Sequence, residues 1–187
     1  MADAHARFEE IYDHYAALIL AYAARRVTAA EDAADVLADT FTVAWRRIDE
    51  VPAGEAARPW LYAVARRCLG NQRRARRRRE RLEARLAAQI TTVVANSTTH
   101  RPLLDGELVT AFNKLSANDR EILTLLAWDG LGRDDIATVM GWSRARVRLR
   151  LHRARTRLLR LLGTPVADDA ATPDGAATPS APTRELS

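Results

Sequence analysis

The stretch GWSRARVRLRLHRARTRLLRLL, from Gly141 to Leu162, has an arginine at almost every second position and is otherwise rich in leucine and alanine. Side chains advance about 100° per residue on a helix, so one stripe can pack on a core: Val147, Leu151, Ala154, Leu158, Leu161 and Leu162. Ser143 stands where an N-cap oxygen would accept a backbone N–H. The stretch therefore predicts a helix that is buried on one side and strongly cationic on the other.

The residues before this helix predict the first half of a helix-turn-helix. A short helix is expected from Arg133 to Met140, in which the small Ala137 lets two helices approach, and Gly141 makes the turn. The second helix of such a motif lies in the major groove of DNA. The residues predicted to meet DNA are Arg144, Arg146, Arg148, Leu149, His152 and Arg153. Flanking arginines are expected to hold phosphates, and an ordinary helical hairpin with a solvated arginine face is the alternative.

The composition of the whole chain favours an anionic partner. It has 187 residues, 48% of them hydrophobic, which is enough to bury the core of one domain or of two small ones. The formal net charge is +5, and Lys114 is the only lysine among 29 basic residues. Arginine's planar guanidinium suits phosphates and base edges. A GC-rich coding sequence would inflate arginine and alanine in the same way, and composition alone does not separate the two explanations.

The sequence lacks the residues that a disulfide, a metal site, a catalytic site or a membrane span would need. Cys68 is the only cysteine, which excludes an intramolecular disulfide and a cysteine cluster for zinc, and no histidines have a metal spacing such as HExxH. No nucleophile, base and orienting acid can be assembled, so neither an enzyme nor a metal or cofactor is expected. No segment has the roughly 20 apolar residues of a membrane span, and the N-terminus lacks a signal-peptide core. A cytoplasmic protein is therefore predicted.

Helical periodicity before residue 86 predicts an all-α first half. A helix is expected near residues 7–26, with an apolar stripe of Phe8, Ile11, Tyr12, Tyr15, Leu18, Ile19 and Tyr22. Thr28 and Glu31 form a capping-box pattern for a helix that runs to about Arg47, with a buried face of Leu37, Phe41, Ala44, Trp45 and Ile48. Residues 49–58 predict a loop. Past Pro59, a long helix is expected to turn Trp60, Leu61, Val64, Ala65 and Cys68 inward.

Two small helical domains joined by a flexible linker are expected. Residues 1–85 form the first domain, and residues 86–104 lose the helical period and gather threonine, serine and asparagine, which predicts the linker. Residues 105–163 form the second domain, in which helices over 108–115 and 117–128, the latter capped by Ser116, precede the helix-turn-helix. The tail, residues 164–187, is small, polar and broken by proline, so disorder is predicted there.

The order of these pieces resembles a known family. ADVLADTFTVAWRRIDEVP (34–52), RPWLYAVARRCLGNQRRARRRR (58–79) and KLSANDREILTLLAWDGLGRDDIATVMGWSRARVRLRLHRARTRL (114–158) resemble, in this order, the conserved second and fourth regions of extracytoplasmic-function (ECF) sigma factors of the sigma-70 superfamily. The resemblance covers about Phe8 to Leu162. It implies a transcription initiation subunit that binds core RNA polymerase through the beta and beta-prime subunits and recognises promoter DNA. It leaves open an anti-sigma factor as a further partner.

The resemblance also implies roles for residues of the first domain. The second helix would dock on the largest polymerase subunit through Asp32, Asp35, Asp39, Thr42, Val43 and Arg46; a solvated acidic face is the alternative. The loop 49–58 and the helix after it would recognise and melt the minus-ten element through Arg58, Trp60, Arg66, Arg67, Asn71, Arg73, Arg74 and Arg77. Capture of a flipped base needs a flat wall, and Trp60 is either that wall or part of the core.

In the second domain, the resemblance assigns the arginine helix to the minus-35 element. A stand-alone helix-turn-helix regulator is the main alternative, although it leaves the helices around Asp35 and Trp60 without a task. A recombinase with a helix-turn-helix tail is another, and it would need a catalytic cluster of acids or serine that the sequence does not show.

Overall fold

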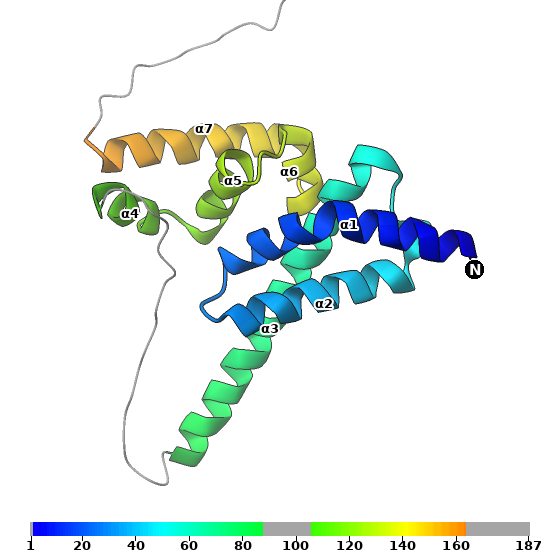
Figure 1. Cartoon of the computed structure of the whole chain (residues 1–187). Helices are drawn as coiled ribbons and strands as arrows, with labels where there is room; N and C mark the ends of the chain where they lie inside the picture. Colours follow the sequence, from blue (N-terminus) through cyan, green and yellow to red (C-terminus); the bar gives the residue numbers. More distant parts are fainter. Residues whose placement is uncertain (1, 88–105, 164–187) are drawn as a thin grey trace, which may run out of the picture.

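The computed structural model describes residues 2–87 and 106–163, and within these ranges the chain is helical and contains no strand (Figure 1). The α-helices are α1 (Ala2–Ala24), α2 (Ala30–Arg46), α3 (Ala57–Ala87), α4 (Gly106–Asn113), α5 (Ala117–Ala127), α6 (Arg133–Met140) and α7 (Arg144–Leu161). Short 3-10 turns at Ile48–Glu50 and Gly54–Ala56 join α2 to α3. The predicted tail and, apart from residues 86 and 87, the predicted linker lie outside the described residues.

The first unit consists of α1, α2 and α3, and the first half of α3 packs against α1 and α2. Ile19 of α1, Val36 of α2 and Leu61 of α3 are fully buried among them. The capping box predicted from Thr28 and Glu31 is not formed. The N-cap of α2 is Ala29, which makes no side-chain cap hydrogen bond, and Glu31 is only the second residue of the helix, one position too early to complete the box.

Tyr12, Leu18 and Trp45, placed on buried faces by the sequence, are between 37% and 44% exposed. The predicted apolar stripes were wider than the surface that the neighbouring helix covers, and these residues fall at the edges. Tyr12 lies edge-on against Phe41, with ring centroids 4.7 Å apart, and Trp45 lies edge-on against Phe8 at 5.2 Å. They therefore extend an aromatic cluster to the surface rather than fill the core.

The long helix α3 changes character along its length. Its first half contributes Leu61, Val64, Ala65 and Cys68 to the core, as the sequence predicts, and also Tyr62, which the predicted stripe did not include. From Arg73 to Leu82 every residue is exposed, and the helix extends away from the rest of the molecule (Figure 1). The run of arginines is thus borne on a helix end that touches little else.

The second unit consists of α4 to α7, and its helix boundaries follow the sequence closely. Ser116 caps α5 by accepting the backbone N–H of Asp119 at 3.2 Å, and Ser143 caps α7 by accepting that of Arg146 at 3.3 Å. Gly141 ends α6 in the left-handed conformation at φ 65°, which glycine adopts without steric cost. The predicted all-helical fold with a helix-turn-helix is confirmed.

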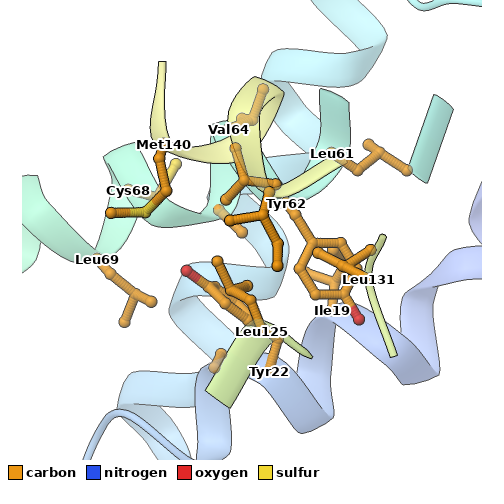
Figure 2. Close-up of a cluster of buried hydrophobic side chains, with 14 of the residues drawn as sticks. Ile19, Tyr22, Leu61, Tyr62, Val64, Cys68, Leu69, Leu125, Leu131 and Met140 are labelled. Atoms are coloured by element: carbon orange, nitrogen blue, oxygen red, sulfur yellow. The ribbon is translucent and has the colours of Figure 1, made fainter. Parts of the chain in front are cut away.

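The two units share one hydrophobic core. Tyr22 from α1 and Tyr62 from α3 lie beside Leu125 from α5 and Leu131 from the turn before α6, and Met140 of α6 lies near Cys68 of α3 (Figure 2). Tyr22 and Tyr62 meet edge-on with ring centroids 5.0 Å apart. The second unit is therefore packed against the first and not separated from it.

Candidate nucleic-acid interface

Buried side chains fix the rotation of α7 about its own axis. Val147, Leu151 and Ala154 are each at most 3% exposed and pack on α5 and α6. Their spacing of three and four residues defines one face of a helix, so the opposite face is forced outward. The apolar stripe read from the sequence is confirmed at these positions, and the cationic face it leaves is directed to solvent.

The outward face of α7 presents long side chains that have no acidic partner among the described residues. Arg148, Leu149, His152 and Arg153 are exposed, and Leu149 is 49% exposed, a large value for an apolar side chain. Arg153 lines a shallow depression near the end of the helix together with His152, Thr156, Arg157 and Arg160. Such a surface offers hydrogen-bond donors to phosphates and base edges, and an apolar contact at Leu149.

Arg144 and Arg146, the other two residues predicted to meet DNA, lie at the start of α7 and each contacts a side chain that precedes this helix. The guanidinium of Arg144 lies 2.9 Å from the Asp134 carboxylate, both well exposed, and that of Arg146 lies over the Trp142 ring at 4.4 Å. Contacts of this kind in water are weak and salt-sensitive, so they orient the two arginines without removing them from solvent.

Arg150 is an exception among the arginines of the flanks. Its guanidinium donates to the Asp119 carboxylate and, at 2.9 Å, to the Ser116 hydroxyl, so it joins α7 to the capped start of α5. Asp119 is buried and accepts the Ser116 hydroxyl at 2.7 Å. This arginine therefore helps to hold α7 in place, a task that the sequence pattern did not distinguish from phosphate binding.

The residues predicted for the minus-ten element are spread along one helix and differ in exposure. Arg67, Asn71, Arg73, Arg74 and Arg77 are exposed on α3, and Arg66 is half-buried. Arg74 donates to the Asn71 side chain at 2.5 Å, and Arg73 donates to the Arg26 carbonyl at 3.0 Å. They form a cationic row at successive turns, which is suited to a phosphate backbone.

Arg58 and Trp60, at the start of α3, are half-buried, unlike the exposed residues of the cationic row. Trp60 is half-buried and packs against the core, and the structure thus gives it a packing role. Arg58 is half-buried, lies 5.9 Å from the centroid of the Tyr62 ring and donates to the backbone carbonyl of Asp129 in the second unit. Its Nε is buried and has no hydrogen-bond partner in the structure. In this arrangement Arg58 faces the second unit.

The residues predicted for polymerase docking line the outer side of α2. Asp35, Asp39, Thr42 and Arg46 are exposed, whereas Val43 is half-buried and packs against the core. Asp32 is half-buried and accepts from the Gln72 amide at 3.2 Å. The exposed carboxylates lie four residues apart on one helix face and have no ion-pair partner among the described residues.

Further observations concern metal ligands, membrane-spanning helices and the single cysteine. No group of three or more potential metal ligands occurs in the described part of the chain, and no helix of that part is long and apolar enough to cross a membrane. Cys68 is buried, and its burial raises the pKa of the thiol above the ordinary value, which makes the reactive thiolate scarce.

The sequence reasoning missed a cluster of charged side chains between the two units. Arg25 and Arg26, at the end of α1, reach Glu121 of α5 and Asp129 of the turn after it. No local pattern signals such pairs, since 95 or more residues separate the partners in sequence. The only available hint was the charge itself at a helix end, where cations are common for other reasons.

Comparison with known families assigns both units. A family model of sigma-70 region 2 matches residues 11–79, and a model of sigma-70 region 4 matches residues 105–158. The first range covers α1 from Ile11 onward, α2 and most of the described part of α3, and the second covers α4 to α7 nearly to its end. The two regions therefore occur in the order that the sequence motifs predict.

Known sigma factors are similar in sequence to this protein along most of the chain. The ECF RNA polymerase sigma factor SigL of Mycobacterium tuberculosis is 32% identical over 158 residues, which cover 81% of this chain and 85% of SigL. The sigma factor CnrH of Cupriavidus metallidurans is 31% identical over 153 residues, which cover 76% of this chain and 80% of CnrH. The solved structure of the sigma factor RpoE from Bartonella quintana with the anti-sigma factor NepR matches with TM-score 0.57 and 25% identity, over 83% of this chain and 96% of that one. The chain belongs to the ECF RNA polymerase sigma factors.

Proposed function

We propose that this protein binds core RNA polymerase and directs it to promoters whose minus-35 element is read by α7 and whose minus-ten element is bound by the first unit. The observation that carries the proposal is the exposed cationic face of α7, held in one orientation by its buried stripe, in a chain that also has sigma-70 region 2. A stand-alone helix-turn-helix regulator is not favoured, because it would leave residues 11–79 without a function.

In the minus-35 contact, Arg148 and Arg153 are the base readers and Arg157 is a phosphate contact. The first two are exposed on the face opposite the buried stripe, where a helix in the major groove meets base edges. Arginine donates two hydrogen bonds to the O6 and N7 atoms of guanine, so a guanine opposite either residue is the expected preference. Leu149 offers an apolar surface to a thymine methyl group.

In the minus-ten contact, the cationic row on α3 holds the backbone while the loop before it meets the bases. Arg67, Arg73, Arg74 and Arg77 are exposed at successive turns and gain affinity by releasing counterions from DNA. Trp60 packs against the core, so we assign it to support of the loop rather than to the wall of a base pocket. The first unit then includes residues up to about 85 and the second residues 105–163, with the linker between them.

Polymerase docking is assigned to the outer face of α2. Asp35 and Asp39 are exposed carboxylates one turn apart, which suits a basic surface on the partner, and Thr42 and Arg46 continue the same face. As a subunit that acts with polymerase on DNA, the protein works in the cytoplasm and contributes binding, without catalysis of its own. In solved structures, the anti-sigma factor NepR binds RpoE of Bartonella quintana and the cytosolic domain of CnrY binds CnrH, and we propose an anti-sigma factor as a partner here.

The decisive experiment adds the purified protein to core RNA polymerase and sequences the 5′ ends of the transcripts. We expect starts downstream of one shared pair of sequence elements. Asp35→Arg together with Asp39→Arg should reduce binding to the core enzyme sharply while thermal stability changes little, because exposed substitutions usually shift stability by about 0.5 kcal/mol or less. Asp13→Arg with Glu9→Arg, on the exposed side of α1, is the matched control. Unchanged co-purification of the α2 variant with polymerase would remove α2 from the interface.

A further inference from the structure

The contact between the two units contains a buried network of charges. Glu121 accepts from the Arg26 guanidinium at 3.1 and 3.2 Å and from the Tyr22 hydroxyl at 3.0 Å. Asp129 accepts from Arg26 at 3.3 Å and also from Arg25, and its backbone carbonyl accepts from Arg58. We call Arg25, Arg26, Arg58, Glu121 and Asp129 the charge latch. All its arginines come from the first unit and both its carboxylates from the second.

Arg26 and Asp129, at the centre of the charge latch, are desolvated, unlike the ion pairs on the surface of the protein. The Asp129 side chain is 0% exposed and that of Arg26 is 7% exposed, whereas the pair Arg76–Glu80 on α3 is 60% and 55% exposed. The Arg26 guanidinium also lies 3.7 Å from the centroid of the Tyr22 ring. Burial by itself would lower the pKa of Arg26, and Glu121, Tyr22 and Asp129 raise it on balance. Charges in such a place are stable only while each keeps its partners.

The arginines that hold the two units together are guanidinium groups of the kind that also bind phosphate. Arg26 lies beside Arg73, which donates to the Arg26 carbonyl, and so borders the cationic row of α3. Arg26 and Arg58 are largely covered by the second unit in this structure, so a phosphate cannot reach them until Glu121 and Asp129 leave. A carboxylate and a phosphate are alternative ligands for the same guanidinium fork.

From this we infer that Arg25, Arg26 and Arg58 form a phosphate-binding surface of the first unit, and that Glu121 and Asp129 of the same chain occupy it in the free protein. The second unit thus acts as an internal competitor of DNA, and the chain opens when a nucleic-acid backbone takes the arginines. The inference rests on the proposed function for the identity of the polyanion. The closure itself is independent of that function.

The apolar part of the contact sets the conditions of the test. A chain without the two latch carboxylates would still keep the apolar contact between Tyr22, Tyr62, Leu125 and Leu131. Loss of the carboxylates therefore lowers the fraction of closed molecules but does not abolish closure. In the closed form of Glu121→Gln/Asp129→Asn, Arg26 is buried without an anionic partner, and the more exposed Arg25 loses the carboxylate that it binds. In the open form they are hydrated. The substitutions therefore disfavour the closed form specifically.

The test measures energy transfer between dyes on Ala17→Cys of α1 and Thr138→Cys of α6, which are exposed sites on the two units. Cys68 is buried with a raised thiol pKa and does not compete for the dyes. Energy transfer should fall in the Glu121→Gln/Asp129→Asn variant of the full chain. The control, Asp13→Asn/Glu107→Gln, alters net charge equally at exposed positions on α1 and α4 and should keep the transfer of the parent chain.

Binding of a labelled duplex of random sequence by the same proteins, without polymerase, provides the second measurement. A chain that is open about a tenth of the time binds about tenfold more weakly than one that is always open. We therefore expect the latch variant to bind the duplex up to about tenfold more tightly than the control variant. Removal of the arginine in Arg26→Gln, added to the latch variant, should reverse part of that gain.

Two outcomes would overturn the inference. Equal energy transfer in the latch variant and its control would show that the charges do not hold the chain closed, and equal duplex affinity would show that the arginines they cover do not bind phosphate. Circular dichroism verifies folding, and Glu121→Gln alone, at the edge of the network where the side chain is 19% exposed, repeats the test if Asp129→Asn impairs folding. Transcription with core polymerase is scored separately, so a failure of the proposed function leaves the energy-transfer result intact.

Discussion

The helix α7 and the second half of α3 both carry dense arginine, yet only α7 is held against a core. Val147, Leu151 and Ala154 bury one side of α7, whereas every residue from Arg73 to Leu82 on α3 is exposed (Figure 1). A helix whose rotation is fixed presents each side chain in one direction, as base reading requires. A helix end without that support can offer charge but little direction. The same composition thus predicts sequence readout in one place and phosphate attraction in the other.

The largest expected effect tests whether this difference in support is real. Leu151→Ala should destabilise the protein by about 2 to 5 kcal/mol, because it removes a buried side chain and leaves a cavity in the contact of α7 with α5. Leu82→Ala, at a leucine 58% exposed on α3, should change stability by about 0.5 kcal/mol or less. Urea unfolding followed by circular dichroism measures both. Similar losses would mean that the end of α3 packs on something in solution.

The next effect concerns DNA and compares individual arginines of the two helices. Arg148→Ala or Arg153→Ala should cost about 1 to 3 kcal/mol at the preferred minus-35 sequence and relax the preference at one or two positions. Arg157→Ala on α7 and Arg77→Ala on α3 should weaken all sequences alike and lower the magnitude of the salt slope by about one contact.

The measurement for this comparison is binding of the polymerase holoenzyme to promoter variants across a salt series. Arg77→Ala and Arg157→Ala serve as controls for the loss of one positive charge without loss of readout. A changed sequence preference in Arg157→Ala, together with a uniform loss in Arg148→Ala and Arg153→Ala, would show that α7 faces DNA with a different side.

The parts of the fold that could be predicted from sequence are those with local causes. The bounds of α6 and the caps Ser116 and Ser143 follow from signals within a few residues, and they agree with the structure. The exposure of Trp45 could not be predicted, because it depends on how far the neighbouring helix reaches over an apolar stripe. The pairing of Arg25 with Asp129 spans 104 residues and depends on how the two units dock. Sequence periodicity specifies neither how far a neighbouring helix reaches nor how the two units dock.

The same limit applies to the candidate site. The outward positions of α7 could be predicted, because a helix with one buried stripe has only one opposite face. The sequence treated Arg150 as another flanking arginine, and only the position of α5 shows that Asp119 and Ser116 bind it. Arg58 was predicted to meet DNA from a resemblance, and its contact with Asp129 appears only when the second unit is placed. Partners from distant elements decide which arginines are available to a ligand.

The smallest expected effect compares one ion pair from each helix. Asp119→Asn removes the charge that binds Arg150, and since Asp119 is buried and also accepts the Ser116 hydroxyl, a loss of about 1 kcal/mol is expected, discounted for the partial exposure of Arg150. Glu80→Gln removes the exposed partner of Arg76 on α3, 2.9 Å away, and should cost at most about 0.5 kcal/mol.

Thermal unfolding at low and high salt distinguishes the effects of these two substitutions, because a Debye length of about 3 Å at 1 M salt screens an exposed pair far more than a buried one. The effect of Glu80→Gln should therefore vanish in 1 M salt, while that of Asp119→Asn should persist. If both disappear together, the Asp119–Arg150 contact is as open to water as the pair on α3, and the rotation of α7 depends on its apolar stripe alone.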